Sequence, residues 1–82
     1  MPKTWRESVA DAINRLVRRS GKRTFLRQDL IAEELPRIVE ETLSEGVTPE
    51  QTLSRVLQEL RDDGQIRFLE PGKYEVVKYP VR

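Results

Sequence analysis

The sequence contains no cysteine and no histidine, and it has few glycines and aromatic residues. Without thiol or imidazole groups, zinc centres, haem attachment and catalysis by Cys or His are excluded. No apolar stretch approaches the about 20 residues that a membrane-spanning helix requires, and none resembles a secretory signal. From these absences we expect a soluble, cytoplasmic protein that has no metal, no other cofactor and no membrane contact.

The length and composition predict a single small domain over residues 1–82. A chain of 82 residues buries roughly 60% of the surface that its unfolded form exposes. Charged residues make up 35% of the sequence. Hydrophobic residues make up 37%, and they recur with helical periodicity, which argues against disorder. The core must therefore consist of packed helices and a small sheet.

The net charge of the chain is close to zero, but the charged residues are distributed unevenly along it. The net charge is +1. Residues 1–27 hold eight basic and two acidic side chains, a balance of +6. Residues 28–50 hold one basic and seven acidic side chains, a balance of −6. Such a division favours a basic surface for a polyanion beside an acidic surface that avoids it, although charged surface helices without any partner give the same pattern.

The first half of the chain predicts two helices with a short strand between them. Thr4 and Glu7 form a capping box at the start of a helix over about 4–19, which Gly21 ends. Residues 24–26 are long enough only for a strand stub. A second helix is expected over about 28–44. Because proline lacks an amide donor, we expect Pro36 to kink this helix or to split it into 28–34 and 36–44.

The second half predicts a helix followed by a hairpin. Thr48 is the expected N-cap of a helix over 48–63, with Pro49 at the first helical position and Gln51 completing a capping box. Two short runs with strand character follow over 66–77, joined by Pro71 and Gly72. Pro-Gly favours a type II turn, which matches the twist of a tight hairpin poorly.

The order of these elements predicts the fold class. Three helices, a strand stub after the first and a C-terminal hairpin are typical of the winged helix-turn-helix. We therefore expect an α+β protein, mainly α, in which helix 48–63 is the recognition helix and hairpin 66–77 is the wing.

The polar face of helix 48–63 is the candidate for reading bases. In helix-turn-helix proteins the N-terminal part of this helix enters the major groove. Arginine pairs with guanine and glutamine with adenine through two hydrogen bonds. Arg55 and Gln58 are the strongest candidates, because the capping box competes for Gln51. The full set of candidate base contacts is Gln51, Thr52, Ser54, Arg55 and Gln58.

Basic side chains elsewhere are candidates for the DNA backbone. One group lies between the first helix and the second, where some members could instead pair with Glu33 or Glu34, and two more lie in the hairpin. Phosphate contacts of this kind make affinity depend on salt. The candidates are Arg18, Lys22, Arg23, Arg27, Arg67 and Lys73. Trp5 and Tyr74 are expected to pack in the core.

No pattern of catalytic residues is apparent. Metal-dependent nucleases of the common restriction type need Glu/Asp-x-Lys, in which one residue separates the carboxylate from the lysine. In this sequence two residues separate Glu70 from Lys73, and two separate Glu75 from Lys78. Alternation along a strand would place the carboxylate and the amine on opposite faces. We therefore do not expect the chain to be an enzyme.

From Phe25 onward the sequence resembles the helix-turn-helix module that follows the nuclease domain of the Dam-replacing, DpnI-like restriction endonucleases. The resemblance is carried by residues 25–30 (FLRQDL), 48–53 (TPEQTL) and 57–69 (LQELRDDGQIRFL) with Gly72-Lys73-Tyr74. It is weaker over 33–46. The resemblance implies a prokaryotic module for sequence-specific binding of double-stranded DNA, associated with a nuclease domain or subunit in restriction-modification.

Two functions therefore remain as hypotheses. The first is a DNA-binding module that accompanies a nuclease or acts alone, as a monomer or a weak homodimer. The second is a winged-helix module for protein interaction or dimerisation that does not bind DNA and uses the acidic surface over 33–45 or the first helix.

Overall fold

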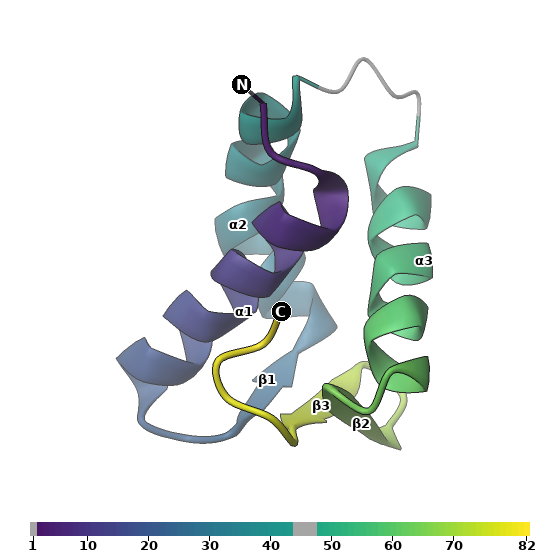
Figure 1. The fold of residues 1–82 in the computed structure, drawn as a ribbon. Helices are drawn as coiled ribbons and strands as arrows, with labels where there is room; N and C mark the ends of the chain where they lie inside the picture. Colours follow the sequence, from purple (N-terminus) through teal and green to yellow (C-terminus); the bar gives the residue numbers. More distant parts are fainter. Residues whose placement is uncertain (1, 44–47) are drawn as a thin grey trace.

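The computed structural model describes residues 2–43 and 48–82. Three helices and three short strands follow one another as α1 (Trp5–Ser20), β1 (Thr24–Leu26), α2 (Arg27–Thr42), α3 (Pro49–Asp62), β2 (Ile66–Glu70) and β3 (Lys73–Val76). The helices lie above a small antiparallel sheet, and α3 runs beside α1 and α2 toward the hairpin (Figure 1). The expected α+β, mainly helical composition is confirmed. Within the described ranges, no helix has the length and apolar character needed to cross a membrane.

Helix α1 begins and ends as its sequence predicts, to within one residue. The Thr4 hydroxyl accepts a hydrogen bond from the Glu7 amide, and the Glu7 carboxylate accepts one from the Thr4 amide, so the capping box is present. At the other end Gly21 has a φ of 73°, a left-handed conformation that glycine adopts without strain. Its amide donates to the Val17 carbonyl and ends the helix.

Helix α2 continues through Pro36 as a single helix, so of the two predicted alternatives, a kink or a split into 28–34 and 36–44, the split is wrong. Proline leaves the carbonyl of Ala32 without its helical donor, but both residues are exposed, so water can replace the missing hydrogen bond. Buried leucine and isoleucine side chains on either side of Pro36 hold both halves against the core. The helix ends at Thr42, and the predicted last residue, 44, lies outside the described residues.

Helix α3 covers the predicted segment but lacks the predicted capping box. Thr48 is the N-cap, yet its side chain makes no capping hydrogen bond. Its backbone carbonyl accepts hydrogen bonds from the amides of Gln51 (3.1 Å) and Thr52 (3.2 Å). With a φ of −137° and a ψ of 72°, Thr48 departs from the extended geometry that directs a capping hydroxyl toward the first turn. The Gln51 side chain is therefore exposed to solvent and not committed to a cap.

The strands form one antiparallel sheet in the order β1-β3-β2. Gly72, with a φ of 79°, occupies the turn between β2 and β3. The register shifts between Phe68 and Glu70, so that Phe68 faces Tyr74 while Glu70 faces Lys73. A shift of this kind accommodates a Pro-Gly turn whose twist does not match the strands.

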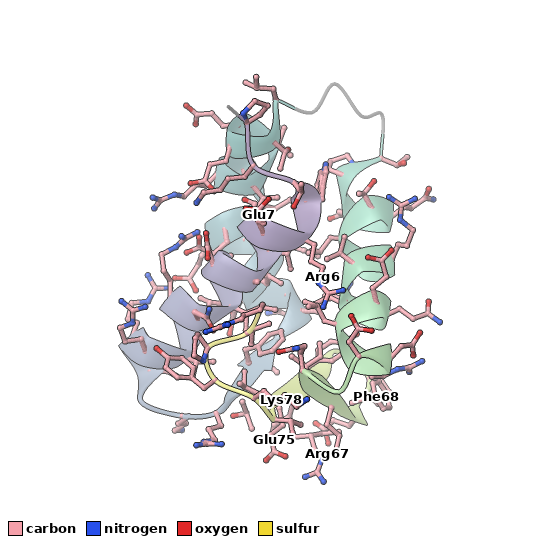
Figure 2. All side chains as sticks on the ribbon, viewed as in Figure 1. Arg6, Glu7, Arg67, Phe68, Glu75 and Lys78 are labelled. Atoms are coloured by element: carbon pink, nitrogen blue, oxygen red, sulfur yellow. The ribbon has the colours of Figure 1, made fainter. Side chains whose placement is uncertain are left out.

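The segment after β3 returns to α1 and completes the core. Val81 is 3% exposed and packs in the core cluster. The buried Asn14 side chain donates to the Val81 carbonyl (3.1 Å) and accepts from the Val81 amide (2.8 Å), as a neighbouring strand would. Arg6 contacts both the Arg82 carbonyl and the Asp63 carboxylate, and so joins this segment to the end of α3 (Figure 2).

Polar contacts also join α1 to α2. Glu41 accepts hydrogen bonds from the buried Ser8 hydroxyl (2.8 Å) and from Arg37 (3.2 Å). The Lys3 ammonium lies 3.5 Å from the same carboxylate. Farther along α1, Arg15 pairs with the buried Glu34 at 2.6 Å. These contacts hold the two helices in one register along their length.

Replacing Asn14 tests the attachment of the C-terminal segment. Asn14→Ala would leave the buried amide of Val81 without a partner, which costs about 1–3 kcal/mol. We expect urea unfolding to show this loss in the free energy of unfolding. The control Gln28→Ala, at an exposed amide of α2, should change it by less than about 0.5 kcal/mol. An equal effect of the two substitutions would contradict the assigned role of Asn14.

The environment of Glu41 makes the free energy of unfolding depend on pH. The hydrogen bond from Ser8, supported by Arg37 and Lys3, holds the pKa of Glu41 below its ordinary value of 4.5. The folded state therefore gains stability above that value and loses it as the pH falls through the lowered pKa. Ser8→Ala should raise the pKa of Glu41 and weaken this acid-dependent loss, as measured by NMR titration and by urea unfolding between neutral and acidic pH. Ser20→Ala is the control, and unchanged titration of Glu41 in Ser8→Ala would disprove the assignment.

Candidate nucleic-acid interface

Helix α3 has a buried apolar face and an exposed polar face. Leu53, Val56, Leu57 and Leu60 are each at most 2% exposed. Gln51, Arg55 and Gln58 lie on the opposite face and are exposed to solvent, as the helical spacing predicts. These side chains therefore carry hydrogen-bonding groups outward from a helix whose other side is held in the core. Thr52 lies closer to the body of the protein and is only partly exposed.

Arg27 joins three elements of the candidate interface. Its amide donates to the Gly72 carbonyl in the hairpin turn at 2.8 Å. Its guanidinium donates to the Ser54 hydroxyl (2.8 Å) and to the Glu50 carbonyl (3.3 Å) in the first half of α3. The start of α2, the first half of α3 and the turn of the hairpin therefore meet at one residue, which uses its backbone for the hairpin and its side chain for α3. Arg27 and Ser54, predicted to contact phosphate and base respectively, contact each other.

A hollow lies between α3 and the hairpin. It has a volume of about 260 Å³ and is lined by Ser54, Leu57, Gln58, Arg61, Phe68 and Tyr74. Two predicted base contacts, Ser54 and Gln58, thus face the hairpin across a concave surface. Arg61 lines the hollow but was not among the predicted site residues.

A row of aromatic rings crosses the sheet to the edge of this hollow. The buried Phe25 stacks on Tyr74 with a centroid distance of 5.5 Å, and Tyr74 contacts the edge of Phe68 at 6.0 Å. Tyr74 is therefore partly buried and packs against the core, as expected, while it also lines the hollow. Phe68 is 45% exposed, and nearby Leu69 and Leu26 are each 40% exposed. Sequence reasoning missed Phe68, although its two-residue spacing from buried Ile66 places it on the sheet face that packs against the helices.

The basic residues of the first segment do not form one surface. The Arg23 carbonyl accepts the amide of Val76 at the far end of β3, whereas Arg27 contacts the hairpin turn. Strand β1 therefore separates them, and four residue steps in an extended chain span about 13 Å. Arg18, Lys22 and Arg23 lie together at the end of α1, around a second depression that includes Tyr79. Only Arg27, of the four predicted phosphate contacts in this segment, lies beside α3.

Other charged side chains near the interface are partly neutralised. Arg67 forms an ion pair with Glu75 at 2.5 Å on the sheet face turned away from the helices, while Phe68 lies beside the end of α3 (Figure 2). Lys73 is partly buried next to the turn. On α3 itself the exposed charges are mixed, with Glu50, Arg55, Glu59, Arg61 and Asp62. The α3 surface thus offers directed hydrogen bonds more than a strong positive charge.

The described residues bring no metal-binding cluster together. Over 2–43 and 48–82, no three acidic side chains converge closely enough to hold a metal ion. Comparisons with protein-family models, with curated proteins and with solved structures found no match. The interpretation of the site therefore depends on its own geometry.

Proposed function

We propose that this protein is a winged helix-turn-helix module that binds double-stranded DNA through α3. The convergence at Arg27 of the start of α2, the exposed half of α3 and the hairpin turn is the observation that carries the proposal. In this fold the same three parts are the ones that approach a duplex, with α3 in the major groove. The hairpin β2–β3 would then be the wing.

Base reading is assigned to the outward side chains of α3. Arg55 has the geometry for two hydrogen bonds to guanine, and Gln51 and Gln58 have that for adenine. The absence of a side-chain capping bond at Thr48 leaves Gln51 available for this role. The Ser54 hydroxyl accepts from Arg27 and donates to the Glu50 carbonyl, and therefore only its remaining lone pair would accept a hydrogen bond from a base. Thr52, being partly buried, contributes at the edge of the contact.

Backbone contacts are assigned to the start of α2 and to the turn of the hairpin. The first amides of a helix and its positive dipole end favour a phosphate. Arg27 and Lys73 lie at this position, and Arg67 lies on the outer face of the wing. Because these cations are few and acidic residues lie nearby, we expect moderate affinity that depends on base contacts as well as on salt.

The sequence resemblance to the module of DpnI-like restriction endonucleases agrees with this proposal. It suggests a nuclease domain or a nuclease subunit as the natural companion of the chain. Nothing in the proposed contacts requires catalysis by these residues, so we assign recognition to this chain and cleavage to such a companion.

Selection of binding sites from random duplexes, followed by affinity measurements, tests the proposal. On a selected site Arg55→Ala should cost about 1–3 kcal/mol, which corresponds to a loss of affinity of about 5- to 140-fold. Arg37→Ala serves as the matched control, since Arg37 is an exposed arginine on α2 that pairs with Glu41. No enrichment of any sequence, or equal effects of the two substitutions, would refute base reading by α3.

The apolar tip of the hairpin favours a second candidate function, which is self-association. Phe68 is 45% exposed on the sheet face that packs against the helices, and Leu26 is 40% exposed on the opposite face, so each presents apolar surface near the tip of the hairpin. Sedimentation equilibrium tests this alternative. A dimer that Phe68→Glu dissociates and that excludes DNA would favour protein interaction, whereas a monomer would exclude dimerisation through this surface.

A further inference from the structure

Three cations surround an exposed tyrosine at the end of α1, and we call this the Tyr79 surface. Arg18, Lys22 and Arg23 line a depression of about 220 Å³ together with Val17, Gly21 and Tyr79. All three cationic residues are exposed. Among the described residues, none of the three has a carboxylate within ion-pair distance. Their charge is therefore available to a ligand.

Neighbouring cations on the same helix behave differently. Arg15 pairs with Glu34 and Arg19 pairs with Glu33, both on α2. The basic side chains at this end of α1 that face α2 are thus neutralised within the fold, while Arg18, Lys22 and Arg23 beside Tyr79 have no such partner among the described residues. This division makes the Tyr79 surface a local concentration of positive charge in a protein with a net charge of only +1.

The exposed ring of Tyr79 stands on a backbone that is held on both sides. Before it, the amides of Val77 and Lys78 donate to the Gln65 carbonyl at 2.9 and 3.1 Å. After it, Val81 is buried and paired with Asn14. The tyrosine between these anchors is nevertheless 48% exposed. An aromatic side chain presented from an anchored segment loses little further backbone freedom when it binds a ligand.

We propose that the Tyr79 surface binds single-stranded nucleic acid. Arg18, Lys22 and Arg23 would neutralise successive phosphates, and an unpaired base would stack on Tyr79. Cations that follow the backbone beside an aromatic ring that accepts a base are the combination by which proteins hold single strands. In a duplex the base faces are already stacked, and therefore the ring specifically favours an unpaired strand.

This surface is separate from the duplex interface at α3. Arg23 lies at the base of the hairpin and Arg27 at its turn, so the two surfaces adjoin opposite ends of β1. One molecule would therefore hold a single strand at the Tyr79 surface whether or not α3 reads a duplex. The inference goes beyond the proposed function and does not depend on it.

Fluorescence anisotropy with a labelled thymidine oligonucleotide of about 12 nucleotides tests this inference. Tyr79→Ala should weaken binding about tenfold, while Tyr79→Phe should retain it because the stacking surface is kept. The triple variant Arg18→Gln, Lys22→Gln, Arg23→Gln should reduce the salt dependence by a slope of about 2, since each phosphate contact contributes about 0.7 for a single strand. Arg19→Gln, at the cation paired with Glu33, is the matched control and should change little. Thermal unfolding followed by circular dichroism confirms that each variant is folded.

Two comparisons separate this inference from the duplex proposal and from other anions. The double variant Arg55→Ala, Gln58→Ala should leave the affinity for the oligonucleotide within about twofold, although it abolishes duplex reading if α3 performs that role. Loss of oligonucleotide binding in this variant would place the single strand at α3 and overturn the inference. Equal affinity of Tyr79→Ala and wild-type protein would also overturn it. The inference would likewise be overturned if the protein bound phosphatidylserine vesicles but did not bind the oligonucleotide.

Discussion

Burial of the apolar face of α3 is the constraint on which the proposed interface depends. Four aliphatic side chains on this helix are almost completely removed from solvent, and each contributes about 1.5–3 kcal/mol relative to exposure. A rotation of the helix about its axis would expose them, so the helix has one stable orientation. The outward direction of Gln51, Arg55 and Gln58 is therefore a result of hydrophobic packing on the opposite side, not of any contact that these polar residues make.

A second constraint determines how α3 lies relative to the hairpin. The helix end is connected to β2 through Gly64, and its first half is joined to α2 and the hairpin turn through Arg27. The aromatic row from Phe25 to Phe68 then joins the hairpin to β1 on the sheet face that packs against the helices. Helix α3 and the hairpin are thus joined at both ends of the region where they pack together. The residues that line the hollow between them are therefore held in fixed positions.

The order and approximate limits of the helices and strands could be predicted from the sequence, because periodicity, capping residues and glycines are local signals. The errors arose where local rules were incomplete. Pro36 interrupts no buried hydrogen bond, since it and Ala32 face solvent, and the packing of both helix halves outweighs the lost donor. Thr48 has a cap-forming side chain but a backbone conformation that does not direct it into the first turn.

The candidate site was predictable only in part. The polar stripe of α3 follows from helical spacing alone. The separation of Arg23 from Arg27 does not, because neighbours in sequence were assumed to share a surface and the intervening strand moves the chain to the other end of the sheet. Phe68 and Tyr79 were missed since their exposure depends on how distant segments pack. The Asn14 side chain, which joins the segment after β3 to α1, is 67 residues from its partner Val81 and leaves no pattern in the sequence.

The pairing of Asn14 with Val81 has a consequence for the synthesis of this protein on the ribosome. The Asn14 side chain of α1 is made 67 residues before the backbone of Val81 that satisfies it. Contacts between such distant positions form late because the intervening chain must first be ordered. Until residues 77–82 emerge, one side of α1 stays hydrated and the hydrophobic interior stays open. The contact between Asn14 and Val81 therefore forms only after all three helices have been made.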